Sequence, residues 1–354
     1  MSSKADKIKG FDASGVGAEN GNLFGLPFNL EEAEIVVLPV PWEVTVSYSH
    51  GTANGPQVVL EASPQLDLYD FDHPQGWQQG IFMLEIPDAI RGQNDALKPK
   101  SAEVIKHTES AHIENNQKVK SELVKTDLDL INQACDSLNN WVFEQSKALL
   151  DQGKKVAVLG GDHSVPLGYI QALAQKYDQF GILQIDAHAD LRNAYQGFKF
   201  SHASIMHNVL ASVQVSKLVQ MGVRDICRAE VDRINRSEGR IVSYYDAVLK
   251  NELYQGKAWL DICKRVVQDL PQAVYISFDV DGLDPKLCPH TGTPVPGGLE
   301  LEQTFCLFRE IIRSGRQIIG FDICEIGDDE WDGNVGARIL YKLCNLIGLN
   351  QPIH

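Results

Sequence analysis

Short apolar runs alternate with amphipathic helical stretches through most of the 354-residue sequence. The runs have strand length, whereas 127–149 carries apolar residues at the three- and four-residue spacing of a helix. Strands that read as continuous apolar runs are buried on both faces, as in parallel sheets covered by helices. The sequence therefore predicts an α/β protein, with a three-layer α/β/α architecture and a mainly parallel sheet.

The order of these segments predicts one large domain. The expected strands are 35–41, 80–87, 155–159, 181–186, 217–221, 240–243, 273–280 and 317–324, and the expected helices include 127–149, 168–177, 203–212, 259–269, 302–314 and 335–348. Residues 1–30 are rich in Gly, Asn and Ser, so we expect an irregular N-terminal extension before a single domain over 31–354. Residues 91–122 are polar with little apolar periodicity, which predicts a mobile insertion on the surface.

Composition excludes several classes of partner. A formal net charge of -15 argues against nucleic acid and anionic membranes. No apolar run approaches the roughly 18–20 residues that cross a bilayer, and the first ten residues lack the apolar core of a secretory signal. The seven cysteines are scattered and form no Cys-x-x-Cys pair, which fits a reducing compartment. We expect a cytoplasmic protein.

Acidic and histidine residues follow three of the apolar runs directly. Ligands of α/β sheets bind beyond the carboxyl ends of the strands, so these side chains are candidates for one common site. They are His163, Asp186, His188, Asp190, Asp279 and Asp281. Singly, each motif has a structural explanation, because Asp162 or Ser164 could cap a helix and Asp284-Pro285 is a common turn. Their coincidence at three strand ends favours a metal site.

Two imidazoles and four carboxylates over-supply one ion and suit a pair of ions bridged by a carboxylate and a water. This ligand set suits Mn²⁺ and also holds Fe²⁺, Ni²⁺, Co²⁺ or Zn²⁺. A water shared by two such ions is a strong source of hydroxide near neutral pH.

Three motifs resemble the signatures of the ureohydrolases, a superfamily that includes arginase, agmatinase, guanidinobutyrase, guanidine hydrolase and formiminoglutamase. They are Gly160 to Ser164, Asp186 to Asp190 and Ser277 to Pro285, within a resemblance that runs from about Ile35 to Leu346. The resemblance implies the three-layer fold and two divalent ions, usually Mn²⁺, with Ni²⁺ in some guanidine hydrolases. It also implies homotrimers or homohexamers.

The resemblance also implies a role for each matching residue. His163 and Asp190 would bind one ion, His188 and Asp281 the other, and Asp186 and Asp279 would bridge them. Asp190 would pass a proton to the leaving amine, His202 would exchange protons with solvent, and Glu325 would hold the planar guanidinium. The alternative for His202 is a helix-start histidine without a role, and for Glu325 an ordinary surface acid beside Asp328.

The substrate is less constrained than the chemistry. Arg192 stands where arginase reads an amino-acid head group, and the sequence after Glu325 departs from its relatives, so arginase activity is not expected. Arg192 favours a substrate carboxylate, as in a guanidino acid or formiminoglutamate, whereas acidic residues 328–332 with Trp331 favour a small cation such as guanidine or an agmatine-like substrate. We expect hydrolysis of a guanidino compound to urea. The alternatives are release of formamide, a non-hydrolytic amidino-binding protein, or a related deacetylase.

Overall fold

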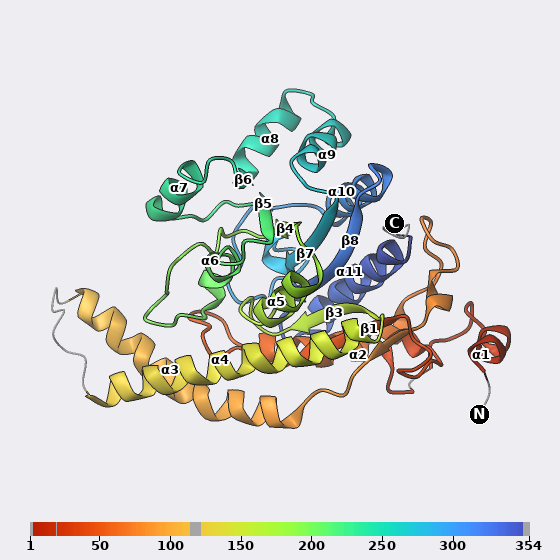
Figure 1. The fold of residues 1–354 in the computed structure, drawn as a ribbon, viewed down its shortest axis with the longest axis horizontal. Coiled ribbons are helices and arrows are strands. Elements are labelled where there is room, and N and C mark those ends of the chain that lie inside the picture. The colour runs from red at the N-terminus through yellow and green to blue at the C-terminus, as the bar shows by residue number, and fades with distance from the viewer. Residues whose placement is uncertain (1–2, 19, 114–121, 350–354) are drawn as a thin grey trace.

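The computed structural model of the protein describes residues 3–18, 20–113 and 122–349, and the strands in these ranges form one sheet. They are β1 (Ile35–Val40), β2 (Ile81–Met83), β3 (Lys155–Gly160), β4 (Phe180–Ile185), β5 (Val215–Met221), β6 (Ile241–Tyr244), β7 (Ala273–Asp279) and β8 (Gln317–Cys324). Every neighbouring pair is parallel, in the order β2-β1-β3-β8-β7-β4-β5-β6 (Figure 1). The predicted α/β class and parallel sheet are confirmed.

Helices connect the strands and cover both faces of the sheet (Figure 1). They are α1 (Lys4–Gly10), α2 (Gly55–Ala62), α3 (Asp88–Ile113), α4 (Glu122–Asp151), α5 (Leu167–Lys176), α6 (Ile205–Val209), α7 (Arg228–Asn235), α8 (Asp246–Tyr254), α9 (Trp259–Gln268), α10 (Leu301–Arg313) and α11 (Glu330–Gly348). Within the described ranges, no helix is both long and apolar enough to cross a membrane.

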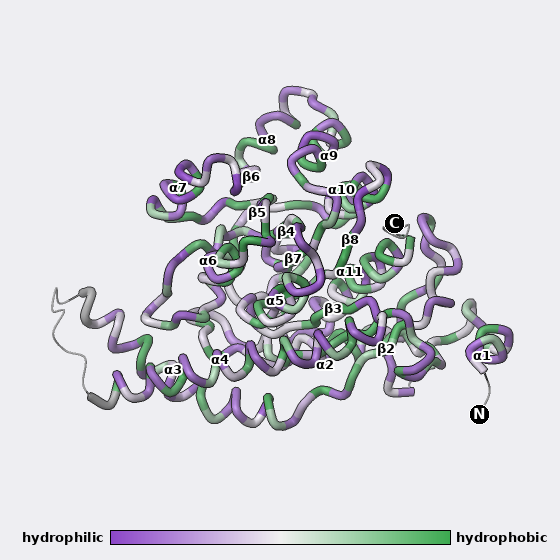
Figure 2. Tube along the Cα trace, viewed as in Figure 1, coloured by the Kyte–Doolittle hydropathy of each residue, from purple (hydrophilic) through white to green (hydrophobic). Residues whose placement is uncertain are grey.

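The alternation of side chains along each strand explains the two covering layers. In β1, Ile35 and Val37 join a core with residues of α2, α8, α9, α10 and α11. Their neighbours Val36 and Leu38 point the other way, into a core with residues of α3, α4, α5 and α6. Both cores are apolar, and Figure 2 shows hydrophobic residues around the sheet and mostly hydrophilic ones along α7. The three-layer architecture is confirmed.

Residues 91–113, part of the predicted mobile surface insertion, form most of the long helix α3, which packs against α4 and which the sequence did not predict. Its buried positions are Asn94, Leu97, Ser101 and Val104, which have the spacing of one helix face. Two of the four are polar, and Pro99 lies inside the helix, so apolar periodicity alone does not reveal it. The rest of the predicted insertion, 114–121, lies outside the described residues.

The N-terminal 30 residues also contain more regular structure than expected. Helix α1 begins at a capping box, in which Ser3 accepts from the Asp6 N–H and the Asp6 carboxylate accepts from the Ser3 N–H. A short 3₁₀ turn at Leu23–Gly25 is buried against the core. The prediction of an irregular extension is wrong for these two segments, because composition does not register a local cap.

Helix α3 supports the loop after β1 through Glu43, which is 2% exposed. The Lys98 ammonium donates to Glu43 Oε1, and Asn94 Oδ1 accepts from the Glu43 N–H at 2.8 Å. The other carboxylate oxygen accepts from the Gly51 and Ala53 N–H groups at 2.7 and 3.1 Å. One buried carboxylate therefore ties α3 to the loop that borders the site described below.

Replacing Lys98 with methionine is expected to lower the free energy of unfolding at pH 7 by about 1–3 kcal/mol, because a buried carboxylate loses a charged partner. Burial alone would raise the pKa of Glu43, but the hydrogen bond and charge of Lys98 and the N–H groups of Ala53 and Gly51 together outweigh it, so the pKa lies below its ordinary value. The stabilisation is therefore present above the unfolded-state pKa and is lost as pH falls through the lower folded-state pKa. Urea unfolding from pH 7 to pH 3 measures this.

The matched control is Lys106→Met, on the same helix but without an ion pair among the described residues. The difference in the free energy of unfolding between the Lys98 and Lys106 variants should shrink as the pH falls. A gap that stays constant from pH 7 to pH 3 would show that the Lys98 side chain acts through packing and not through Glu43.

Candidate metal centre

The six candidate ligands come from loops after three neighbouring regions of the sheet. Strands β3, β8, β7 and β4 are consecutive neighbours, so the loops at their carboxyl ends meet at one edge. His163 follows β3, residues 186 to 190 follow β4, Asp279 ends β7, and Asp281 lies in the 3₁₀ turn Val280–Gly282. The structure thus brings together all six side chains singled out in the sequence.

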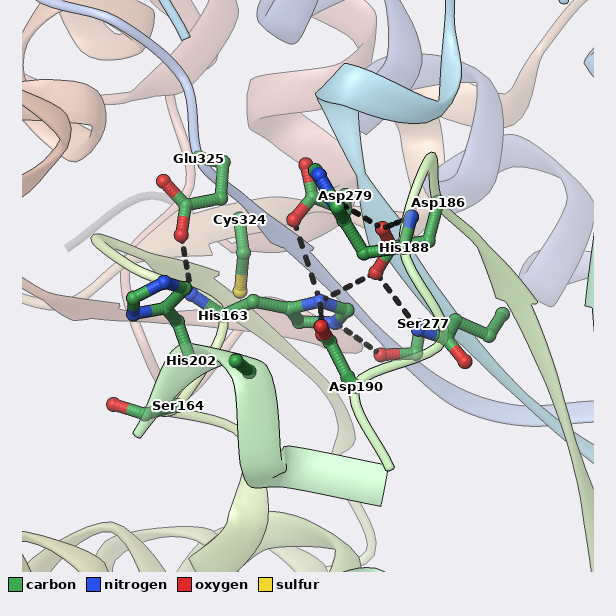
Figure 3. A network of polar contacts seen from close by, with 12 residues as sticks. His163, Ser164, Asp186, His188, Asp190, His202, Ser277, Asp279, Cys324 and Glu325 are labelled. Atoms are coloured by element: carbon green, nitrogen blue, oxygen red, sulfur yellow. Dashed lines mark hydrogen bonds and ion pairs between the residues drawn. The ribbon is translucent and has the colours of Figure 1, made fainter. Parts of the chain in front are cut away.

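His163 is surrounded by three carboxylates (Figure 3). Its Nδ1 lies 3.0 Å from Asp186 Oδ2, 3.1 Å from Asp190 Oδ2 and 3.3 Å from Asp279 Oδ2. Its Nε2 lies 2.9 Å from the Ser277 hydroxyl. Although Nδ1 is buried, it forms no hydrogen bond of acceptable geometry. With the proton on Nε2, the Nδ1 lone pair faces three oxygens that also carry lone pairs.

His188 is the centre of a second group beside the first. Its Nδ1 lies 3.0 Å from Asp281 Oδ2 and 3.5 Å from Asp186 Oδ1. Potential ligand atoms of His163, Asp186 and Asp190 lie within 4.8 Å of one another, and so do those of Asp186, His188 and Asp281. Asp186 therefore belongs to both groups and presents one oxygen to each.

These buried side chains are more favourable with cations between them than without. Burial and then the neighbouring Asp186 raise the pKa of Asp190 to about 7. Burial and then Asp281 raise the pKa of Asp279 well above its ordinary value. Buried carboxylates that disfavour their charged form, around an imidazole nitrogen without a partner, are stabilised when positive charge lies between them. The donor set of nitrogen and carboxylate oxygen fits divalent transition metals.

The backbone is strained at two of these side chains. Asp190 has φ +52° and Glu325 has φ +65°, in the left-handed region that non-glycine residues rarely adopt. The Asp190 carbonyl accepts from the N–H groups of Met206 and His207, and the Glu325 N–H donates to the Gly161 carbonyl at 2.8 Å. These bonds hold both residues in place, and left-handed backbone of this kind clusters at functional sites.

Glu325 follows β8 and lies beside the His163 loop (Figure 3). Its Oε1 accepts from the His163 N–H at 2.9 Å, whereas its Oε2 is buried without a partner. Burial and then Asp162 raise the pKa of Glu325 well above its ordinary value. The carboxyl is not the surface acid that the alternative reading proposed, and one oxygen is free to accept from a bound cation.

His202 starts the 3₁₀ turn His202–Ser204, where the Ser201 hydroxyl caps the turn by accepting from the Ala203 N–H. The His202 N–H donates to the Thr45 hydroxyl at 3.2 Å, and that hydroxyl lies 3.2 Å from Asp162 Oδ2. Burial, followed by the charges of His188 and His163, lowers the pKa of His202 to about 4. The ring is therefore neutral at pH 7.

A cavity of about 300 Å³ opens beside these residues. Its wall includes His188, Asp190 and His202 on one side and Arg192, Tyr195, Asp225 and Glu230 elsewhere. The Arg192 guanidinium lies 5.0 Å from the centre of the Tyr195 ring, and its Nε is 4.0 Å from Glu230 Oε2. Arg192 thus presents a stacked, partly exposed cation to the cavity.

Trp331 and the acidic residues after Glu325 lie elsewhere. Trp331 is in the first turn of α11, 51% exposed, and its indole N–H donates to the Lys286 carbonyl at 3.2 Å. Asp329 caps that helix, and Asp328 accepts from the Asn54 side chain at 2.9 Å. None of 328–332 lines the cavity beside His188 and Arg192. The sequence did not reveal that this acidic stretch begins a helix.

Several supporting residues were missed by sequence reasoning. Gln184 donates to Asp186 Oδ2 at 2.7 Å, and Ser277 contacts His163. Both precede a ligand by two positions on the same strand, so alternation points their side chains toward the ligand side, which is a usable signal. Thr45 and Glu230 come from distant segments. Thr45 accepts from the His202 N–H, and Glu230 accepts from the Leu191 N–H at 3.0 Å. Neither contact has a signature in the sequence.

Comparisons with known proteins agree with the motifs. The arginase family model matches residues 33–343. N(1)-aminopropylagmatine ureohydrolase of Thermus thermophilus is 30% identical over 321 residues, which cover 90% of this chain and 92% of the relative. Agmatinase of Pyrococcus horikoshii is 28% identical over 322 residues, with 91% and 94% covered.

Solved structures show the same fold. Proclavaminate amidino hydrolase from Streptomyces clavuligerus superposes with a TM-score of 0.71 at 18% sequence identity, covering 96% of this chain and 100% of that one. The family match spans the sheet, the cavity and all six candidate ligands. The ureohydrolase resemblance of the sequence is confirmed, and the chain belongs to the arginase family.

Proposed function

We propose that the protein is a metal-dependent hydrolase that cleaves a C–N bond of a guanidino compound and releases urea. The observation that carries the proposal is the pair of overlapping His/Asp groups that share Asp186, beside a cavity lined by His188, Asp190 and His202. Two divalent ions, Mn²⁺ or Ni²⁺, fit these groups, and when bound they supply a nucleophilic hydroxide at neutral pH. The names of the relatives, ureohydrolase and agmatinase, support this reaction.

The ligands divide naturally between the two ions. His163 and Asp190 would hold one, and His188 and Asp281 the other. Asp186 presents an oxygen to each histidine, which supports a bridging role, and Asp279, which faces His163 and precedes Asp281 by two residues, is proposed as the second bridge. All lie at strand ends that the sheet holds rigidly, so the chain presents a preformed site.

Three further side chains would act on the substrate. Glu325 Oε2, buried and without a partner, would accept N–H bonds from the guanidinium and orient its plane. Asp190, which faces His163 and lines the cavity, would pass a proton to the leaving amine. Neutral His202, at the cavity wall, would exchange that proton with solvent.

We further propose that the substrate carries an anionic end, as a guanidino acid does. Arg192 stacks on Tyr195 and faces the cavity, whereas acidic residues 328–332 do not line it. Glu230, whose Oε2 lies 4.0 Å from Arg192 Nε, already accepts from the Leu191 and Cys227 N–H groups. Asp225 is the competing group, because it also lines the cavity and would attract a cationic end.

The decisive experiment is a substrate panel with protein loaded with Mn²⁺ or with Ni²⁺. Guanidine, agmatine, 4-guanidinobutyrate, arginine and formiminoglutamate are offered separately, and urea and formamide are assayed. We expect urea from 4-guanidinobutyrate at the highest kcat/KM. Formamide alone would refute the guanidino reaction, and no product from any compound would favour a binding protein. Preference for agmatine would assign the tail to Asp225.

Replacing Arg192 with methionine is expected to lower kcat/KM for 4-guanidinobutyrate about 10- to 100-fold, the worth of one charged hydrogen bond. Activity toward agmatine should fall much less, because its tail has no carboxylate. The control is Arg228→Met on α7, since Arg228 is an exposed arginine that pairs with Asp232 and does not line the cavity. Equal losses for both substrates would contradict recognition of a carboxylate by Arg192.

We also propose a homotrimer or homohexamer in the cytoplasm, built from one domain over 31–354. The oligomeric state rests on the family resemblance. The compartment is supported by seven free cysteines, which fit a reducing environment.

A further inference from the structure

Arg224 binds main-chain carbonyls of three chain segments beside the candidate metal centre. It lies two residues after Gly222, in the loop that follows β5. Its Nη2 donates to the Asp281, Leu283 and Val295 carbonyls at 2.7, 3.0 and 2.8 Å. Its Nη1 donates to Gly222 at 3.1 Å and contacts the Gly282 carbonyl at 3.4 Å, and its Nε donates to Val295 at 3.2 Å. One guanidinium thus holds five carbonyls.

These contacts converge on the His188 and Asp281 pair. Three of the five carbonyls belong to 281–283, the turn that carries Asp281. The backbone N–H of Arg224 donates to the Ala187 carbonyl at 2.8 Å, next to His188. The main chain of Arg224 therefore holds the His188 loop, and its side chain holds the Asp281 turn. This single residue connects the two.

The guanidinium pairs with no carboxylate among the described residues, so its hydrogen bonds go to main-chain oxygens alone. The close approach of the Arg224 guanidinium to the Leu283 carbonyl depends on Gly298, which has φ +101°. A Cβ there would lie 2.5 Å from the Leu283 carbonyl and 2.9 Å from Arg224 Nη2. Only a planar fork reaches oxygens on several sides at once, and a lysine ammonium, a single point of charge, does not.

The other half of the centre is held differently. The Asp190 carbonyl accepts from the N–H groups of Met206 and His207 in α6, and the His163 N–H donates to Glu325. Arg224 contacts none of these residues. Loss of its side chain should therefore loosen the Asp281 turn and leave the His163 and Asp190 pair in place.

We propose that Arg224 is a positioning residue for one of the two ions, since its guanidinium fixes the Asp281 turn at the distance from His188 that this ion requires. The inference rests on the proposed two-metal function. Partners behind metal ligands typically contribute 10- to 100-fold to metal affinity. The structure thus assigns unequal supports to the two ions, and a change at Arg224 should weaken one of them.

The test is a Mn²⁺ titration of metal-free protein, with free Mn²⁺ measured by electron paramagnetic resonance. Wild-type protein should bind two ions per chain. Arg224→Lys should bind the first ion with unchanged affinity and the second at least about tenfold more weakly. The spectrum of the bound ions should change from that of a coupled pair to that of an isolated ion. Arg240→Lys is the matched control, because Arg240 also binds only carbonyls, those of Ser212 and Val215.

The outcomes separate the two proposals. Wild-type protein that binds fewer than two ions refutes the proposed function, and this inference with it. If the wild type binds two ions and the Arg224 variant binds both with equal affinity, the inference alone is refuted. An Arg240 variant that loses the same ion also refutes it.

A measurement on wild-type protein keeps the test valid if the variant does not fold. In hydrogen-exchange mass spectrometry, the second equivalent of Mn²⁺, and not the first, should slow exchange in peptides that cover 280–284 and 222–225. Protection that arrives with the first equivalent, or not at all, overturns the inference.

Discussion

Replacing Asp186 with asparagine is expected to lower kcat at least about 1000-fold, which corresponds to about 4 kcal/mol of transition-state stabilisation. Asp186 is the one residue in both His/Asp groups, with Oδ2 3.0 Å from His163 Nδ1 and Oδ1 3.5 Å from His188 Nδ1. Asparagine keeps the size of the side chain but replaces one oxygen with an NH₂ group, which cannot act as a metal ligand. Turnover and metal content per chain, measured after dialysis, test the result.

The matched control is Asp284→Asn. Asp284 lies in the same motif as Asp279 and Asp281, but its carboxylate accepts from the Lys286 N–H and belongs to neither group. This control should keep two ions and near wild-type turnover. An Asp186→Asn protein that retained both ions and full activity would refute the two-metal proposal.

Replacing His202 with alanine is expected to lower kcat about 100-fold or more while both ions remain bound, because proton transfer by a positioned side chain typically contributes that much. His202 lines the cavity, and its lowered pKa keeps it neutral at pH 7. It belongs to neither His/Asp group, so its loss should not release metal. Steady-state kinetics and metal analysis of the same preparation separate a proton relay from a ligand.

His207→Ala is the control for that experiment. His207 lies on the adjacent helix α6, and its ring contacts Arg233 and not the cavity. Its replacement should leave kcat within a few-fold of the wild type. Added imidazole should restore part of the activity of the His202 variant. Loss of metal from that variant would show that the ring supports the ions, contrary to the relay role.

The sequence was sufficient to predict that the six candidate ligands lie at one edge of the sheet, for a simple physical reason. Asp186, His188 and Asp190 follow a strand at alternate positions, and parallel strands present their carboxyl ends at one edge. The rule places these side chains at one edge, but their close approach also requires β3, β7 and β4 to lie near one another in the sheet. The order itself, with β8 and β7 between β3 and β4, depends on long-range pairing that no local pattern encodes.

The helical segments that the sequence did not predict share another cause. Helix α3 buries Asn94 and Ser101 along with apolar residues, so its inward face has no apolar stripe. Trp331 and its acidic neighbours have the composition of a loop, but Asp329 caps the helix that they begin. Sequence patterns record apolar faces well and record polar burial poorly. The contacts of Arg224 with five carbonyls are an extreme case, since carbonyls carry no sequence information.

The strand order also dictates when the site can assemble during synthesis. Before residues 273–324 leave the ribosome, the chain contains two separate parallel groups, β2-β1-β3 and β4-β5-β6. The inner edges of β3 and β4, which carry His163 and Asp186, then have no partner strand. In the folded sheet β8 pairs with β3, and β7 pairs with β4, so both edges stay open until these two strands are in place. Until then the nascent protein is exposed to aggregation at the two strands that precede four of the candidate metal ligands, His163, Asp186, His188 and Asp190.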